Sequence, residues 1–173
     1  SIAVWSYKGA ADDPDEGNVL RNNTVQMPWR ANCFAIYGGL SNTIENSVCE
    51  DVLAYPGLMV GNLFNPHPFG SDMPTTRSIN PSTPISANVT TQIKNMTIIR
   101  GGGFFFNAEQ GAIKITAEQG GVSDILIENV DVIDSLFAGV HLNTGTQKNI
   151  KLKNVNVKGS GTYGFLLENN PTG

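Results

Sequence analysis

Two short segments near the end of the chain repeat one pattern, about 25 residues apart. Asp124–Val132 (DILIENVDV) and Asn149–Val157 (NIKLKNVNV) both read polar, Ile, any residue, apolar, charged, Asn, Val, Asp or Asn, Val. Weaker copies occur at Asn18–Val25 and Asn42–Val48, and a fragment occurs at Asn95–Ile99. A period of roughly 20 to 50 residues built from short strands and turns is typical of stacked repeats.

A second kind of short apolar segment alternates with these copies, and several of its members follow a glycine. The segments are Ile2–Trp5, Phe34–Tyr37, Leu58–Val60, Ala112–Ile115, Val140–Leu142 and Phe165–Leu167. The chain has 19 Gly and 19 Asn, residues that suit turns and left-handed backbone. We therefore predict an all-β fold, a right-handed parallel β-helix of about 25 residues per coil. A β-sandwich is the alternative, but it does not require matched Asn positions one period apart.

Asparagines at matched positions of the repeat can stack on one another. Asn129 and Asn154 are predicted to form an amide ladder, and Asn22 and Asn46 another. The repeat is interrupted between Leu58 and Ala112, where residues 62–86 are rich in proline and predict a long loop insertion. The length suits a single domain over residues 1–173.

Composition restricts the classes of partner. Charged residues make up 15% of the chain and the net charge is -4, so a nucleic-acid partner or an anionic membrane surface is not expected. No apolar run approaches the roughly 20 residues of a membrane-spanning helix. Cys33 and Cys49 can form one bridge or remain two buried thiols. Sequons at Asn22, Asn88 and Asn95 permit N-glycosylation.

Aromatic residues indicate where a sugar could bind. Trp5 and Tyr37 end equivalent strands of consecutive repeats, and Trp29 precedes the strand that Tyr37 ends. Rings aligned outside a stack of repeats can contact the C–H faces of sugars. Trp5, Trp29 and Tyr37 are therefore predicted to bind substrate, and packing at the ends of strands is the alternative for each.

The acidic residues and histidines give weaker signals. Glu50 and Asp51 follow a strand and could face a groove, whereas the acidic run within residues 12–16 is expected to be a solvated turn. His67 and His141 are expected to be structural or hydrogen-bonding residues. No Cys or His cluster has metal-ligand spacing, so no metal site or cofactor is predicted.

The first part of the chain resembles a known enzyme family. The residues that carry the resemblance are Ile2–Ser6 (IAVWS) and Asn22–Gly39 (NNTVQMPWRANCFAIYGG), and it continues weakly through Tyr55–Gly57 and Pro66–Phe69. From Ile2 to Phe69 these segments are similar to glycoside hydrolase family 87, the α-1,3-glucanases and mycodextranases. The rest of the chain matches only as a generic β-helix.

The resemblance implies a secreted protein with a right-handed β-helix that cleaves α-glucans internally, with inversion, through aspartates. In the family an Asp-Asp pair precedes the strand corresponding to Ile2–Trp5, so the catalytic residues are expected just upstream of Ser1. The chain is thus expected to be the C-terminal part of a catalytic domain. Its expected partners are a polysaccharide and, at the ends of the stack, the remainder of its own β-helix or neighbouring chains.

Two other functions are considered. A pectin-degrading enzyme handles anionic sugars and requires basic residues in its groove, but Arg30, Arg77 and Lys114 are scattered in the sequence. A non-catalytic glycan-binding or structural protein, of the phage-fibre or adhesin type, is the alternative from another class.

Overall fold

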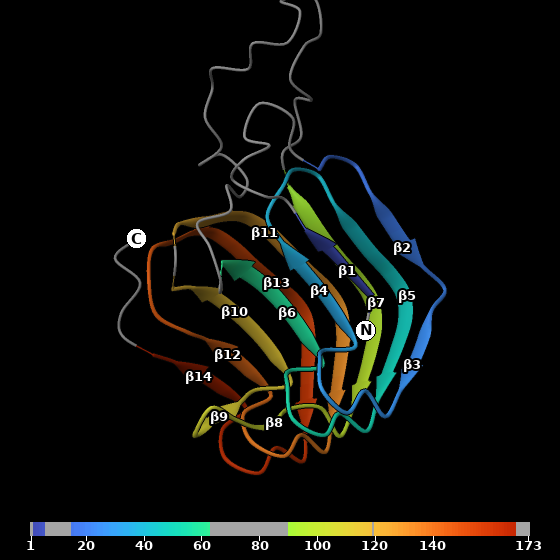
Figure 1. Cartoon of the computed structure of the whole chain (residues 1–173), viewed down its shortest axis with the longest axis vertical. Coiled ribbons are helices and arrows are strands. Elements are labelled where there is room, and N and C mark those ends of the chain that lie inside the picture. Colours follow the sequence, from blue (N-terminus) through green and yellow to red (C-terminus); the bar gives the residue numbers. More distant parts are fainter. Residues whose placement is uncertain (1, 6–14, 63–89, 119, 169–173) are drawn as a thin grey trace, which may run out of the picture.

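The computed structural model describes residues 2–5, 15–62, 90–118 and 120–168, which form strands and turns (Figure 1). The strands are β1 (Ile2–Trp5), β2 (Val19–Arg21), β3 (Thr24–Gln26), β4 (Phe34–Tyr37), β5 (Thr43–Glu50), β6 (Leu58–Asn62), β7 (Thr91–Ile99), β8 (Gly103–Phe105), β9 (Ala108–Gln110), β10 (Ile113–Ala117), β11 (Val122–Ile133), β12 (Val140–Leu142), β13 (Gln147–Lys158) and β14 (Phe165–Leu167). Within these residues there is no helix long and apolar enough to cross a membrane.

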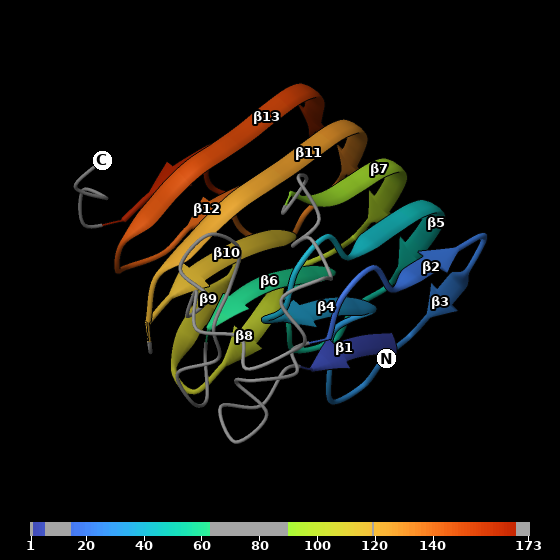
Figure 2. The same cartoon turned by 90° about the horizontal axis from the view of Figure 1, so that it is seen from above.

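All strands except β8 and β9 belong to two parallel sheets that face each other (Figure 2). The first sheet has the order β1-β4-β6-β10-β12-β14, and the second has the order β13-β11-β7-β5-β2, with β3 also pairing with β5. The chain passes from one sheet to the other within each repeat, so strands adjacent in one sheet come from consecutive repeats (Figure 2). Each predicted strand segment overlaps at least one strand, and Asn18–Val25 is divided between β2 and β3.

The predicted right-handed parallel β-helix is wrong as a description of this chain, although the all-β class is right. The strands form separate sheets, two of them parallel and a third, β8-β9, antiparallel, rather than one regular solenoid. The step from Leu58 to its partner Ile113, which contains the predicted interruption, is more than twice as long as the step from Val140 to Phe165. In the turns that connect the two sheets, consecutive repeats are joined by isolated backbone hydrogen bonds and not by continuous strand pairing. The two parallel sheets are therefore separate.

Inward-facing aliphatic residues from both sheets form the core. Ile44, Ile93 and Ile127 are directly paired positions of three neighbouring strands, and all are fully buried. Between the two sheets, Cys33 and Cys49 form a disulfide with a Cα–Cα distance of 5.7 Å. Of the two states left open by the sequence, the structure therefore has the bridge.

Asparagines in left-handed backbone form a ladder along the second sheet. The Nδ2 group of Asn95 donates to Asn46 (3.1 Å), that of Asn129 to Asn95 (3.2 Å) and that of Asn154 to Asn129 (3.0 Å). All four residues have φ between 50° and 54°, a conformation that asparagine tolerates better than most residues. The predicted pair of Asn129 and Asn154 is confirmed as the last step of this longer ladder.

Two segments differ from what the sequence suggested. Asn62, the first residue of the predicted loop insertion, ends β6, and residues 63–86 of that loop lie outside the described residues. The short hairpin β8-β9 was not predicted. It reverses the chain at Phe106 and Asn107, which both have positive φ.

Candidate functional site

Polar residues gather on the outer face of the first sheet. Alternate residues of β10 point to opposite faces, so Ile113 and Ile115 enter the core while Lys114 lies on the other face. Lys114 pairs in register with Met59 on one side and with His141 on the other. The outer face therefore carries a row in which apolar and titratable side chains adjoin.

Two adjoining hollows occupy this face, with volumes of about 390 Å³ and about 370 Å³. Both are lined by Ala108, Lys114 and Glu118, so we treat them as one depression, the first-sheet groove. Its other lining residues are Tyr55, Met59, Phe105, Phe106, Glu109, Gln110, His141, Asn143, Leu166 and Glu168. One end of the groove is thus mainly aromatic and the other mainly polar.

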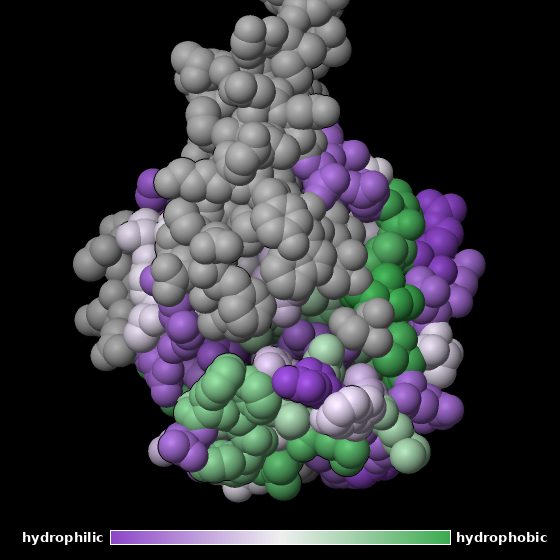
Figure 3. Space-filling view, in the orientation of Figure 1, coloured by the Kyte–Doolittle hydropathy of each residue, from purple (hydrophilic) through white to green (hydrophobic). Residues whose placement is uncertain are grey.

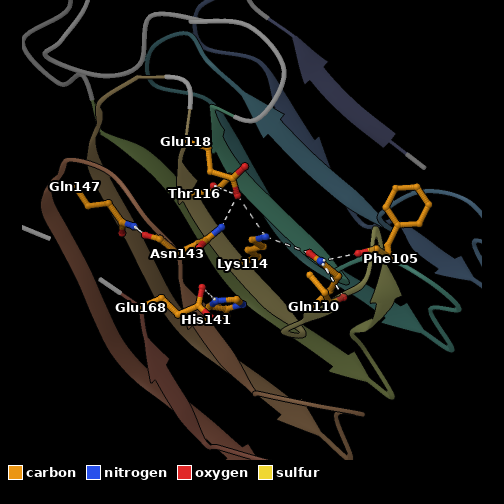
Figure 4. Close-up of polar contacts among 10 residues, drawn as sticks. Phe105, Gln110, Lys114, Thr116, Glu118, His141, Asn143, Gln147 and Glu168 are labelled. Atoms are coloured by element: carbon orange, nitrogen blue, oxygen red, sulfur yellow. Dashed lines mark hydrogen bonds and ion pairs between the residues drawn. The ribbon is translucent and has the colours of Figure 1, made fainter. Parts of the chain in front are cut away.

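Lys114 is a buried cation at the centre of the groove, with 6% of its surface exposed. Its Nζ lies 3.2 Å from Oε1 of Gln110 and 3.7 Å from Oε1 of Glu118 (Figure 4). Burial lowers the pKa of Lys114, and the nearby carboxylate of Glu118 opposes that shift.

Glu118 is the residue on which the polar contacts converge. Its Oε1 accepts a hydrogen bond from the Thr116 hydroxyl (3.2 Å) and another from the Nδ2 group of Asn143, besides the ion pair with Lys114 (Figure 4). Three donors, two from β10 and one from the residue that follows β12, therefore hold one carboxylate oxygen. A carboxylate held in this way is fixed in position.

His141 and Glu168 form the next step along the groove. The Nε2 atom of His141 lies 3.0 Å from Oε2 of Glu168, within ion-pair distance but without the alignment of a hydrogen bond. His141 is buried, whereas the side chain of Glu168 is 44% exposed. The pair places a second carboxylate in the same hollow as Glu118.

The aromatic end of the groove is attached to the sheet through the β8-β9 hairpin. The Nε2 group of Gln110 donates to the carbonyl oxygens of Phe105 (3.4 Å) and Ala108 (3.3 Å) while its Oε1 faces Lys114. The ring of Phe105 lies 4.1 Å from that of Tyr55, centroid to centroid. Burial raises the pKa of Tyr55. One glutamine thus connects the aromatic wall to the buried cation.

The three predicted substrate-binding aromatic residues differ in how much of each the structure describes. Trp5 pairs with Tyr37 across β1 and β4, as the repeat predicted, but its side chain is outside the described set. Tyr37 is 5% exposed, and its hydroxyl donates to Oδ1 of Asn32 (2.9 Å). Burial raises the pKa of Tyr37. Trp29 is 70% exposed, with the Arg30 guanidinium 5.9 Å from its ring centroid. Tyr37 is therefore not an open ring here, and sugar contact by the three residues stays a prediction.

The other candidate residues are scattered. The carboxylate of Asp51 lies outside the groove and pairs with Arg100, while Glu50 accepts from Gln26 (2.6 Å). Of the three sequons, Asn22 is exposed, Asn95 belongs to the amide ladder and Asn88 lies outside the described residues. His67 is likewise outside them. Within the described ranges no group of three or more His, Cys, Asp or Glu side chains could hold a metal.

Sequence reasoning missed Glu118, Asn143 and Glu168, and it treated Lys114 as an isolated basic residue. One signal was present: Lys114 and Thr116 alternate with Ile113 and Ile115, which places the polar pair on the outer face. The register that brings Asn143 beside Thr116 could not be read from the chain, because the repeats differ in length.

Comparisons with known proteins bear on the whole chain. A family model described as "Alpha-1,3-glucanase catalytic domain D2" matches residues 1–169. A solved catalytic domain of a glycoside hydrolase family 87 α-1,3-glucanase, an aspartate-to-alanine variant in complex with tetrasaccharides, matches with a TM-score of 0.67 and 19% identity over 98% of this chain. The same type of domain in complex with nigerose matches with a TM-score of 0.63 and 18% identity over 95% of this chain.

This chain spans about a third of those solved catalytic domains, 36% of the first and 35% of the second. At such identities the likeness shows the fold alone. No curated protein matches the chain.

Proposed function

Because the chain belongs to the α-1,3-glucanase catalytic domain D2 family, we propose that it forms part of a secreted hydrolase that acts on α-1,3-glucan. In this proposal the enzyme cleaves within the polymer and inverts the anomeric configuration. The match over residues 1–169 is the observation that carries the proposal. The first-sheet groove is the surface on which this part of the protein contacts the glucan.

The chemistry of the groove supports sugar binding. Sugar hydroxyls both donate and accept hydrogen bonds, and the groove offers a carboxylate in Glu118, an ammonium in Lys114 and an amide in Asn143 within one hollow. Its other end offers the rings of Tyr55, Phe105 and Phe106, which suit the apolar faces of sugars. Charged side chains close together and of opposite sign favour a neutral polymer over an anionic one.

Hydrolysis with inversion requires two carboxyl groups, one to protonate the leaving oxygen and one to activate water, about 6.5–9.5 Å apart. We propose that polypeptide outside this chain supplies them, next to the strand β1. In this arrangement Lys114, Glu118 and Asn143 hold the sugar, and the groove residues are binding rather than catalytic groups.

The test uses the longer polypeptide that contains this chain. It is incubated with α-1,3-glucan, and the products are followed by size and by proton NMR of the anomeric centre. The expected result is a mixture of oligosaccharides that first appears with the anomeric configuration opposite to that of the substrate. Retention of configuration would overturn the proposed mechanism, and the absence of any hydrolysis would overturn the proposed activity.

A further inference from the structure

Most of the large apolar side chains that are exposed among the described residues lie in one set of turns. These are the turns that lead from the second sheet to the first. We call this strip the apolar edge, and it comprises Trp29, Leu53, Phe104, Phe106, Leu136 and Tyr163. Phe106 is 84% exposed, and the others range from 56% to 70%. Contiguous exposed apolar surface is uncommon on soluble proteins and marks an interaction site.

Backbone hydrogen bonds place these turns side by side. The amide of Leu53 donates to the carbonyl of Pro28 (3.4 Å), that of Val52 to Arg100 (3.2 Å), that of Leu136 to Gly101 (3.1 Å) and that of Thr162 to Phe137 (3.4 Å). Each turn therefore lies against the turn of the next repeat, in the same order as the strands. With a strand spacing of about 4.8 Å, five turns form a strip roughly 20 Å long. Figure 3 shows hydrophobic residues gathered along the lower rim, where β8 and β9 lie in Figure 1.

Two arginines lie near the apolar edge, one paired with a carboxylate and one beside a ring. Arg100 forms a two-point contact with Asp51, Nε to Oδ1 at 2.5 Å and Nη2 to Oδ2 at 3.0 Å. Arg30 has its guanidinium over the ring of Trp29. A surface that presents exposed rings complements a partner with apolar faces, and a sugar polymer has this character.

The apolar edge is also continuous with the first-sheet groove. Phe106 belongs to both, because it lines the 390 Å³ hollow and is the most exposed side chain of the strip. Its neighbour Phe105 packs against it, with ring centroids 4.2 Å apart. A polymer lying in the groove and passing over this hairpin would next meet Phe104, whose ring lies 6.4 Å from that of Phe137 in the following turn.

We propose that the apolar edge is a second contact surface for the glucan, which holds the part of the polymer that leaves the groove over Phe106. The proposal rests on the proposed function for the identity of the sugar. In this arrangement the protein binds long polymer more tightly than short oligosaccharide, since only a long chain reaches both surfaces.

The test is the double variant Phe104→Ala/Tyr163→Ala in the longer polypeptide, because neither residue lines the groove. Binding is measured by depletion of the protein onto insoluble α-1,3-glucan, and hydrolysis is measured on a tetrasaccharide of the same linkage. We expect roughly tenfold weaker binding to the polymer and unchanged hydrolysis of the tetrasaccharide. Leu167→Ala, which removes a side chain that is 66% exposed and lies outside the strip, is the control and should leave both unchanged.

Unchanged polymer binding in the double variant would overturn the proposal. So would a wild-type dimer in sedimentation that the double variant converts to monomer, since the strip would then be an interface between two copies. If the unaltered protein binds the polymer but cleaves neither substrate, the proposed function fails while the binding measurement still decides the role of the strip.

Discussion

At the scale of single residues, Glu118 connects the charged and polar parts of the first-sheet groove. One oxygen of its carboxylate forms an ion pair with Lys114 and accepts hydrogen bonds from Thr116 and Asn143. Because Lys114 is buried, removing the charge of its partner leaves an ammonium in a poorly solvated place. The Glu118 carboxylate therefore stabilises the local structure, and it is also available to bind a sugar.

Glu118→Gln should destabilise the fold and weaken polysaccharide binding. We expect a loss of about 1–2 kcal/mol in the free energy of unfolding, less than for a fully buried pair because Glu118 is partly exposed. Urea denaturation of both proteins measures it. Glu109→Gln, which removes an exposed carboxylate of the same groove, is the matched control and should change stability little. Equal stability of the E118Q variant and the unaltered protein would show that Lys114 does not depend on this carboxylate.

The exposed ion pair of Asp51 and Arg100 predicts a lowered pKa for the Asp51 carboxyl. The hydrogen bond from Arg100, helped by its charge, lowers the pKa of Asp51 below the ordinary value. The contribution of Asp51 to stability is then present above the pKa of the unfolded chain and is lost as the pH falls through the lower, folded value. NMR titration of the Asp51 carboxyl should give a higher midpoint in Arg100→Gln than in the unaltered protein. The same midpoint in both would rule out the pair as the cause.

At the scale of elements, the asparagine ladder sets the register of the second sheet. Each of its inner members, such as Asn129, donates to one neighbour and accepts from the other while keeping a left-handed backbone. A single position thus combines two hydrogen bonds with a conformation that few other residues tolerate.

Substitutions of Asn129 can separate these two contributions. Asn129→Ala should lose about 1–3 kcal/mol in the free energy of unfolding, because it removes both amide contacts and strains the backbone. Asn129→Gly removes the same contacts but accepts positive φ, so it should be the more stable of the two variants. Denaturant unfolding of the pair measures the difference. A glycine variant no more stable than the alanine variant would mean that backbone strain is negligible at this position.

The sequence predicted the strands and the asparagine ladder better than it predicted which side chains meet in the groove. The paired positions of Trp5 and Tyr37, and the ladder step from Asn129 to Asn154, follow from local pattern because strands and left-handed turns have residue signatures. The long step from Leu58 to Ile113 has a signal as well, the Pro-rich interruption between the two segments. The groove could not be assembled from the sequence, because Glu118 and Asn143 come together only once the residue-by-residue register is known.

At the scale of the whole molecule, the two sheets are joined covalently as well as by packing. Cys33 lies in the turn before β4 of the first sheet, and Cys49 lies in β5 of the second. The double variant Cys33→Ala/Cys49→Ala should lose about 3 kcal/mol of stability, the value for a loop of this length in the chain-entropy model. Thermal unfolding with and without a reducing agent measures it, and the double variant itself should not respond to the reductant. An unchanged melting temperature in the variant would show that packing alone holds the sheets together.

The strand β14, at the end of the first sheet, has exposed apolar side chains. Phe165 is 50% exposed although its partner Val140 is fully buried, and Leu167 in the same strand is 66% exposed. Strand edges of this kind associate with other strands. The chain alone should therefore self-associate, and Phe165→Lys/Leu167→Lys should reduce this in sedimentation velocity. Glu109→Lys, which changes the net charge equally, should not; an equal reduction would point to charge alone.

The unequal distances between paired strands have an evolutionary consequence. Where register is held by amide contacts and by inward-facing aliphatic residues, the connections between strands can gain or lose residues without disturbing their neighbours. The β8-β9 hairpin lies in such a connection, and its residues form one wall of the groove. Insertions and deletions in the turns can therefore change the substrate-facing surface. The sheets beneath it keep their shape even as their sequence changes.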